Sequence, residues 1–480
     1  GQYNVGVGAS VFEANTTGTN NVAVGMRALD ANTTGDQNVS VGGASLGANT
    51  TASNNVAVGY LALTTNTTGA SNTALGDQAL EANTTASNNT AVGKDALTAN
   101  TTGDENVAIG TIALDANTTG VHNTAVGYNA LGANTTASNN TAMGMDALAS
   151  NTTGTSNVAV GQKALEANTT ANGNTAVGLV ALTLNTTGAN NTGIGKGALS
   201  ANTTGENNTA VGYHALDLNT TASNNVAVGE NALAANTTGT ANVAVGQAAL
   251  DANTTANNNT AVGSSALTAN TTGHSNTAVG KNAGAAVTTG DENVAVGSDA
   301  LEAATTANAN TAVGQNALLS TTDGENNTAV GKSALASNTT GSNSVAIGAS
   351  ALGAMTTANA NIAIGKSAGA ANTSGTENVF IGHEAGNDVT TGAGHTLIGY
   401  LAGDKITTAS QNTAVGSEAL GANTGGGLNT AIGYNAMLGN TTGGDCTAVG
   451  ARALDAANAA DGNTAVGSAA LGANTTGAQN

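Results

Sequence analysis

The sequence "NTAVG" at residues 259–263 returns, barely altered, from one end of the chain to the other. Its closing glycine recurs every 17 residues, from Gly8 and Gly25 to Gly467, without insertion or deletion. Twenty-eight such glycines define the consensus N-[TV]-A-V-G-x-x-A-L-x-A-N-T-T-[GA]-x-N, whose positions we number from 1 at its first Asn. Self-similarity at a short fixed period is typical of a solenoid, in which each repeat forms one coil.

The residue types of the repeat favour strands over helices. Helix-pair repeats need roughly 30 or more residues per unit. Thr, Val, Asn and Gly are moderate to poor helix formers that suit short strands and tight turns. Disorder, which low complexity favours, does not explain why apolar positions stay apolar while their neighbours vary. We therefore expect an all-β fold, a parallel β-solenoid of about 28 coils that runs through residues 1–480 as one repeat array.

The composition excludes several classes of partner. The 480 residues include 8% charged residues and carry a net charge of −20. Phosphate groups and anionic membranes attract basic patches, so we expect contact with neither nucleic acid nor membrane. The single cysteine, Cys446, cannot form an intrachain disulfide. Because the sequence begins and ends inside a repeat, we expect a fragment of a longer fibre whose caps, anchor and tip lie outside it.

The expected strand, at positions 2 to 4, carries no charge on either face. Position 4 is always apolar, position 2 is Thr, Val or Ile, and position 3 is Ala in 23 of 28 repeats. Neighbouring strand residues point to opposite faces, so one face should line the interior and the other should meet a second copy, most simply in a parallel homotrimer. The predicted core residues are Val24, Leu29, Leu97, Val262 and Ile381, and the predicted chain–chain interface comprises Ala23, Ala244, Ala261, Ala278, Phe380 and Leu397.

A second pattern in the repeat conflicts with simple alternation. Position 9 is usually Leu but is Gly in four repeats. In the last two of these repeats, position 3 holds a large residue instead of Ala. This exchange indicates that positions 3 and 9 share one packing space, whereas alternation groups positions 2, 4 and 9 in the interior. The sequence therefore supports either assignment of the strand's two faces. The residues concerned are Gly284, Gly369, Gly386 and Gly403 at position 9, with Phe380 and Leu397 at position 3.

The other recurrent residues of the repeat are typical of the turns at the corners of a coil. Asn at positions 1 and 12 can stack from coil to coil through side-chain amides, and the Gly at position 5 suits a turn with positive φ or a close backbone approach. Asn-Thr-Thr, as at residues 15–17, reads both as such a stacked corner and as an N-glycosylation sequon.

Catalytic and metal-binding motifs are not found in the sequence. His383-Glu384 begins like the zinc-protease signature HExxH, but Asn387 stands where the second His belongs. The other histidines lack paired ligands at metal spacing, and no insertion interrupts a repeat to carry a site. We predict no catalytic residue, cofactor or metal, and no enzymatic activity.

The motif "NTAVG" and its variants "SVAIG" (344–348) and "NIAIG" (361–365) resemble the repeats of trimeric autotransporter adhesin heads. The run at residues 123–144 is also similar to repeat arrays of phage tail-fibre-like proteins. The resemblance extends over essentially the whole chain, although adhesin heads use a shorter coil. It implies a left-handed parallel β-roll, three chains about one axis, and positions 2 and 4 pointing into each roll, such as Val22 and Val24, or Thr260 and Val262.

Three functions follow from these observations as hypotheses. The first is a structural fibre or stalk, viral or bacterial, that lies outside the cell or on the virion and contacts a host receptor through a tip domain beyond this sequence. The second is an ice-binding solenoid, since Thr-Thr pairs such as Thr16 and Thr17 recur in most repeats. The third, which the sequence supports least, is a polysaccharide-degrading enzyme.

Overall fold

The computed structural model describes residues 1–456 and 459–480, and these contain short β-strands joined by turns, with no helix. Each strand has three residues, at positions 2 to 4 of a repeat. The chain divides into two compact units, the N-terminal unit (Gly1–Thr240) and the C-terminal unit (Ala241–Asn480).

The N-terminal unit contains β1 (Val5–Val7), β2 (Val22–Val24), β3 (Val39–Val41), β4 (Val56–Val58), β5 (Thr73–Leu75), β6 (Thr90–Val92), β7 (Val107–Ile109), β8 (Thr124–Val126), β9 (Thr141–Met143), β10 (Val158–Val160), β11 (Thr175–Val177), β12 (Thr192–Ile194), β13 (Thr209–Val211) and β14 (Val226–Val228). The C-terminal unit contains β15 (Val243–Val245), β16 (Thr260–Val262), β17 (Thr277–Val279), β18 (Val294–Val296), β19 (Thr311–Val313), β20 (Thr328–Val330), β21 (Val345–Ile347), β22 (Ile362–Ile364), β23 (Val379–Ile381), β24 (Thr396–Ile398), β25 (Thr413–Val415), β26 (Thr430–Ile432), β27 (Thr447–Val449) and β28 (Thr464–Val466).

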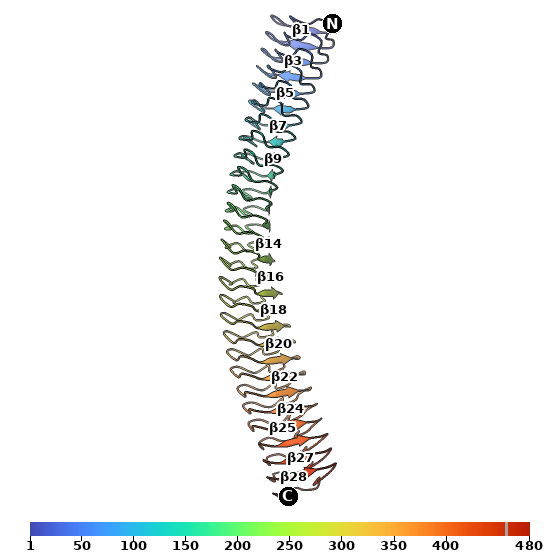
Figure 1. Ribbon diagram of the computed structural model, residues 1–480, viewed down its shortest axis with the longest axis vertical. Coiled ribbons are helices and arrows are strands. Elements are labelled where there is room, and N and C mark those ends of the chain that lie inside the picture. Colours follow the sequence, from blue (N-terminus) through green and yellow to red (C-terminus); the bar gives the residue numbers. More distant parts are fainter. Residues whose placement is uncertain (457–458) are drawn as a thin grey trace. The chain divides into compact units, whose positions relative to one another are not determined.

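Within each unit, every strand pairs in parallel with the next strand along the chain, as β2 does with β3 and β16 with β17. The register never changes: Thr260 lies beside Thr277, and Ala261 beside Ala278. Figure 1 shows the strands of successive coils stacked on one another in each unit. The predicted all-β parallel solenoid with 17 residues per coil is confirmed.

The interior of each coil is lined by positions 3, 8 and 9. In the second coil these are Ala23, Ala28 and Leu29, and none of them has exposed surface. Val22 and Val24, at positions 2 and 4, are partly exposed. Because successive strand residues point to opposite faces, burial of position 3 directs positions 2 and 4 outward.

This arrangement decides between the two assignments of the strand's faces. Leu29 and Leu97 belong to the core, as predicted. The same prediction is wrong for Val24, Val262 and Ile381, which lie partly exposed on the outer face. The resemblance to adhesin heads implied that positions 2 and 4 point inward, and that implication is wrong as well, for Val22 and Thr260 too.

The predicted interface residues are also placed differently from the prediction. They are fully buried inside their own chain and have no surface to offer a partner. The physical reason is the narrow coil, in which the Leu at position 9 fills the interior and leaves room for only a small side chain at position 3. The residues concerned are Ala23, Ala244, Ala261, Ala278, Phe380 and Leu397.

The shared packing space of positions 3 and 9 is confirmed by the exceptions to the repeat. A Cβ atom on Gly386 would lie 2.5 Å from Cδ1 of the buried Phe380 ring, and one on Gly369 would also collide with that ring. A Cβ atom on Gly403 would lie 2.9 Å from Cδ1 of Leu397. A large residue at position 3 therefore requires glycine at position 9 of its own coil and of its neighbour.

Residues with positive φ bend each coil, among them those at positions 5 and 9. The Gly at position 5 has positive φ, as in Gly25 at +134°, and a Cβ atom there would lie 2.5 Å from the carbonyl oxygen of Gly42 in the next coil. Both reasons expected for glycine at this position are confirmed. Leu at position 9 also adopts a left-handed φ, 54° in Leu29 and 55° in Leu97, which is costly for a residue with a side chain. Burial of the Leu side chain offsets this strain.

Candidate functional site

An uncharged strip covers the outer face of the strands. We define the outer strip as the side chains at positions 2 and 4 of every coil. Position 4 is apolar throughout, and several of its side chains are well exposed, with 47% of Leu75, 40% of Ile109 and 44% of Met143 accessible to solvent. Along the strip, equivalent side chains recur about every 4.8 Å, the distance between paired strands. Each unit thus presents two parallel rows of Thr and apolar side chains without a charged residue.

One corner of the coil is closed by the Asn at position 1. The backbone N–H of Asn38 donates to Oδ1 of Asn21 in the preceding coil at 2.9 Å, and Nδ2 of Asn38 donates to the carbonyl oxygen of Ala52 in the following coil at 2.9 Å. Each Asn thus connects to the coil before and the coil after. The side chains are fully buried, so their amide groups depend on these partners.

A second ladder runs through the Asn at position 12. Nδ2 of Asn117 donates to Oδ1 of Asn100 at 2.9 Å and to the carbonyl oxygen of Gly120 at 3.0 Å, while Oδ1 of Asn117 accepts a bond from Asn134. The stacking of Asn side chains predicted from the sequence is confirmed at both corners. The ladder is interrupted where position 12 holds another residue, as at Val389 and Ile406.

The structure assigns different roles to the three residues of Asn-Thr-Thr. The Asn is fully buried and both hydrogens of its amide are engaged, so the folded chain has no free acceptor for a glycan at this position. The hydroxyl of the first Thr donates to the next coil, as Thr118 does to the carbonyl oxygen of Thr135 at 3.0 Å. Only the second Thr, such as Thr119, is exposed. A Thr-Thr pair therefore offers one outward hydroxyl per coil.

Position 16, which the sequence analysis overlooked, also has a structural role. Oδ1 of Asp36 accepts the backbone N–H of Thr19 at 2.6 Å, and Oγ of Ser53 accepts that of Asp36 at 2.9 Å. Short polar side chains at this position thus receive the N–H of the preceding coil. The signal that could have revealed this role is the frequent occurrence of Asp, Ser and Asn at position 16.

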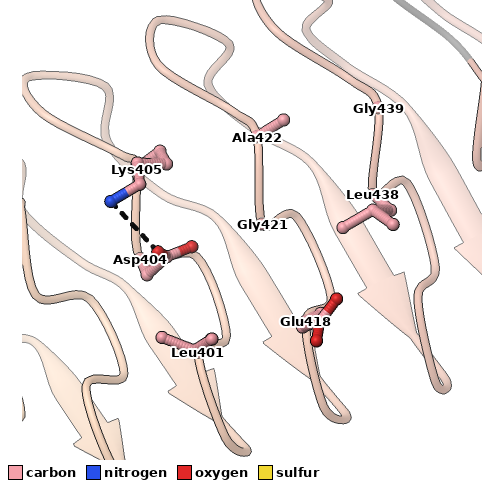
Figure 2. A pocket seen from close by; sticks show the side chains of 8 residues that line it. All are labelled: Leu401, Asp404, Lys405, Glu418, Gly421, Ala422, Leu438 and Gly439. Atoms are coloured by element: carbon pink, nitrogen blue, oxygen red, sulfur yellow. Dashed lines mark ion pairs between the residues drawn. The ribbon is translucent and has the colours of Figure 1, made fainter.

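A hollow of about 450 Å³ lies on the surface of the C-terminal unit, away from the strands. It forms because Gly421, at position 10, has no side chain between Asp404 and Leu438, which hold the same position in the adjacent coils. A Cβ atom on Gly421 would lie 3.0 Å from Cδ1 of Leu438. Figure 2 shows Asp404 and Lys405 on one side of the hollow, Glu418 on the middle coil and Leu438 on the other side. The lining residues are Leu401, Asp404, Lys405, Glu418, Gly421, Ala422, Leu438 and Gly439.

The single cation of this hollow is paired with two carboxylates. Nζ of Lys405 lies 3.1 Å from Oδ2 of Asp388 and 3.2 Å from Oδ2 of Asp404. Its hydrogen bond to Asp388, followed by that to Asp404, raises the pKa of Lys405. Burial raises the pKa of Asp404, and this effect exceeds the opposing influence of Lys405. With apolar walls at Leu401 and Leu438, the hollow suits contact with a small ligand, but its lining residues offer no nucleophile paired with a base.

The other residues considered for chemistry lie apart. His383 contacts its neighbour Glu384, with Nε2 and Oε1 3.7 Å apart, and stacks on Tyr400 with ring centroids 5.6 Å apart. Across residues 1–456 and 459–480, no group of three or more His, Cys, Asp or Glu side chains is placed to hold a metal ion. The described part of the chain also has no helix of the length and hydrophobicity needed to cross a membrane.

Comparison with known proteins gives no match to a family model and none to a curated protein.

Proposed function

We propose that this chain is a structural segment of an extracellular fibre or stalk, on a virion or a bacterial surface, in which copies associate side by side through the outer strip. The observation that carries the proposal is the uncharged row of side chains along every strand of both units. The stacked coils support a mechanical role, because most coils are bonded to the next at two corners as well as along the strand.

The distribution of charge supports association through this strip. The chain carries a net charge of −20, so two copies repel each other across most of their surfaces. The outer strip carries no charged residue in any coil, so it adds nothing to that repulsion. Each unit has fourteen strands. The strip therefore runs through all fourteen strands of a unit as one continuous surface for contact with a second copy.

The arrangement proposed for the copies is a parallel homotrimer. Closed association covers an apolar strip on every copy and leaves none exposed. The number three is supported by the resemblance of "NTAVG" and "SVAIG" to trimeric adhesin heads, which also supports the extracellular location. Contact with a host receptor is then the task of a domain beyond residues 1–480, and the repeat array itself has a non-catalytic role.

The experiment that tests this proposal measures molar mass by light scattering. We expect a mass near three times 45.5 kDa for the unmodified chain. A triple variant with Val245→Glu, Val262→Glu and Val279→Glu places rings of like charge on the strip and should dissociate the assembly. The matched control adds three glutamates at the exposed position 14, through Thr238→Glu, Thr255→Glu and Thr272→Glu, and should keep its mass.

Two outcomes would contradict the proposal. A mass near 45.5 kDa for the unmodified chain excludes stable self-association. An assembly that survives the three substitutions on the strip, but not those at position 14, places the interface elsewhere. The ice-binding alternative receives less support, since only one hydroxyl of each Thr-Thr pair faces outward. Thermal hysteresis measured on the same sample distinguishes the two functions.

A further inference from the structure

His395 occupies a place in the coil where other repeats carry Asn. It stands at position 1, the corner whose side chains bond to the coils before and after, and only 1% of its surface is exposed. Its imidazole lies against the backbone of Gly392, where a Cβ atom would come within 2.6 Å of Nε2. The ring therefore has no room to move away from its hydrogen-bond partners.

The two ring nitrogens reproduce the two bonds of an Asn side chain. Nε2 lies 2.8 Å from the carbonyl oxygen of Ala409, which can only accept, so Nε2 carries the hydrogen. Nδ1 lies 3.2 Å from the backbone nitrogen of Asn412, which can only donate, so Nδ1 is the acceptor. Both bonds are made together only by the neutral ring, because a protonated imidazole has a hydrogen on each nitrogen.

The side chains around the ring are neutral. The neighbouring side chains at this corner are the neutral amides of Asn378 and Asn412. The ionisable groups of this coil and its two neighbours lie at positions 6, 7, 10 and 11, and among the described residues none of them is hydrogen-bonded to the ring. They are His383, Glu384, Asp388, Tyr400, Asp404, Lys405 and Glu418.

The other corner is also weakened in this part of the stack. Position 12 holds Val389 in the preceding coil and Ile406 in the coil of His395. Neither side chain can join the ladder of Asn amides that links coils elsewhere. The contact between β24 and β25 therefore depends more than most on the strand pairing and on the corner that His395 forms.

We propose that His395 makes the contact between β24 and β25 sensitive to acid. Protonation puts a hydrogen on Nδ1 opposite the N–H of Asn412, which removes one bond and leaves a buried cation with only the carbonyl oxygen of Ala409 as its partner. In a repeat array each coil is held chiefly by its neighbours, so loss at one contact opens the stack locally. Burial lowers the pKa of His395, and the bond from Nε2 to Ala409 opposes this effect only in part. The contact is therefore fully stable above the pKa of a free histidine, about 6.5, and weakens as the pH falls below it.

His274 provides an internal comparison. Its Nδ1 also accepts a backbone N–H, but from the preceding coil: the donor is Asn257, at 3.0 Å. His274 is exposed, however, so water can replace the lost bond and solvate the charge when it is protonated. The proposal thus distinguishes a buried histidine from an exposed one that makes the same kind of bond.

Hydrogen exchange of the whole chain, followed by mass spectrometry at pH 7.5 and pH 5.0, tests the proposal. His395→Asn restores the residue of the other coils and removes the titrating ring, and His274→Asn is the matched control. At pH 5.0 we expect amides of residues 396–415 to exchange on the order of tenfold faster in the unmodified chain than in His395→Asn, and equally fast at pH 7.5. His274→Asn should behave as the unmodified chain in that segment.

Equal exchange in the unmodified chain and His395→Asn at pH 5.0 would overturn the proposal. So would faster exchange in the unmodified chain than in both His variants, which would mean that the exposed ring has the same effect. A second readout does not depend on a variant: an NMR titration that places the pKa of the His395 ring at or above that of a free histidine contradicts it as well.

Discussion

The ring of Phe380 occupies the space that a side chain on Gly386 would fill, with Cδ1 2.5 Å from the position of the missing Cβ atom. Six residues apart in one coil, the two are complementary in volume. Most other coils have Ala at position 3 and Leu at position 9, which together have about the same side-chain volume. The interior thus tolerates an exchange of volume between two positions but not an excess at either.

The first prediction concerns this pair. Gly386→Leu restores the residue of most coils but collides with Phe380, and we expect it to lower the free energy of unfolding by about 1–3 kcal/mol. Phe380→Ala leaves a cavity and should cost about 3–5 kcal/mol. The double variant should lose less free energy of unfolding than the sum of the two single variants. The new Leu side chain fills the cavity that Phe380→Ala leaves, and without the Phe ring there is no collision. Denaturant unfolding of all four proteins measures this coupling, and strict additivity would show that the two positions do not share one space.

The second prediction contrasts two neighbours in one strand. Ala261→Asp places an unpaired charge in the interior and should destabilise the chain by about 3–5 kcal/mol. Val262→Asp lies on the outer strip and should cost less than about 1 kcal/mol in the isolated chain. Thermal unfolding under dissociating conditions compares them. A larger loss for Val262→Asp would mean that the two faces of the strand are assigned the wrong way round.

The third prediction concerns the Asn ladder. Asn117→Ala leaves Oδ1 of Asn100 without the bond that it receives from Nδ2, whereas the carbonyl oxygen of Gly120 keeps its bond from Nδ2 of Asn106. Each unsatisfied buried group costs about 1–3 kcal/mol, and we expect a comparable loss in the free energy of unfolding. Thr119→Ala, at the exposed position two residues away, serves as the control and should change little. Similar melting temperatures for both variants would contradict a structural role of the ladder.

The fourth prediction concerns pH. Burial raises the pKa of Asp251, so the charged carboxylate is less favourable in the folded chain than in the unfolded chain. Its charge therefore opposes folding at neutral pH, and this effect disappears as the pH falls below the usual pKa of Asp, 3.8. Asp251→Asn should be the more stable protein at pH 7, with a difference that vanishes near pH 3. A constant difference across this range would show that the carboxyl group is fully solvated.

The length of the coil could be predicted from the sequence because a single recurrent residue, the Gly at position 5, marks it. Glycine at position 5 recurs every 17 residues, and the conformation of Gly25 explains why no other residue replaces it. The Asn corners were predictable for a related reason, since a buried amide needs a partner in each neighbouring coil. Both requirements repeat identically in every coil, and a period in the sequence records them directly.

The two faces of the strand were harder to assign, because neither carries a charge. Ala261 and Val262 are both apolar, and the larger residue was expected inside. The structure reverses them because Leu267, at position 9 of the same coil, already fills the interior. In the sequence, only the occurrence of Phe380 together with glycine at position 9 indicates that position 3 faces the interior. That indication conflicts with simple alternation.

The hollow beside Gly421 could not have been predicted from any single repeat. Asp404, Gly421 and Leu438 each hold position 10, where the residue type varies freely, and each is ordinary within its own coil. The hollow arises only from their order, with the smallest side chain between two larger ones. The acceptor role of position 16 was overlooked for a similar reason, since a polar residue there also reads as one that faces water.

The uniformity of the outer strip has a consequence for how two copies line up. Because successive coils present nearly the same side chains, a copy displaced along the stack by one coil, about 4.8 Å, meets almost the same surface. The strip alone therefore allows many nearly equivalent axial registers between two copies. A single register must therefore be selected by the few larger side chains of the strip, such as Leu75 and Met143, or by other domains that fix the axial position of the chains.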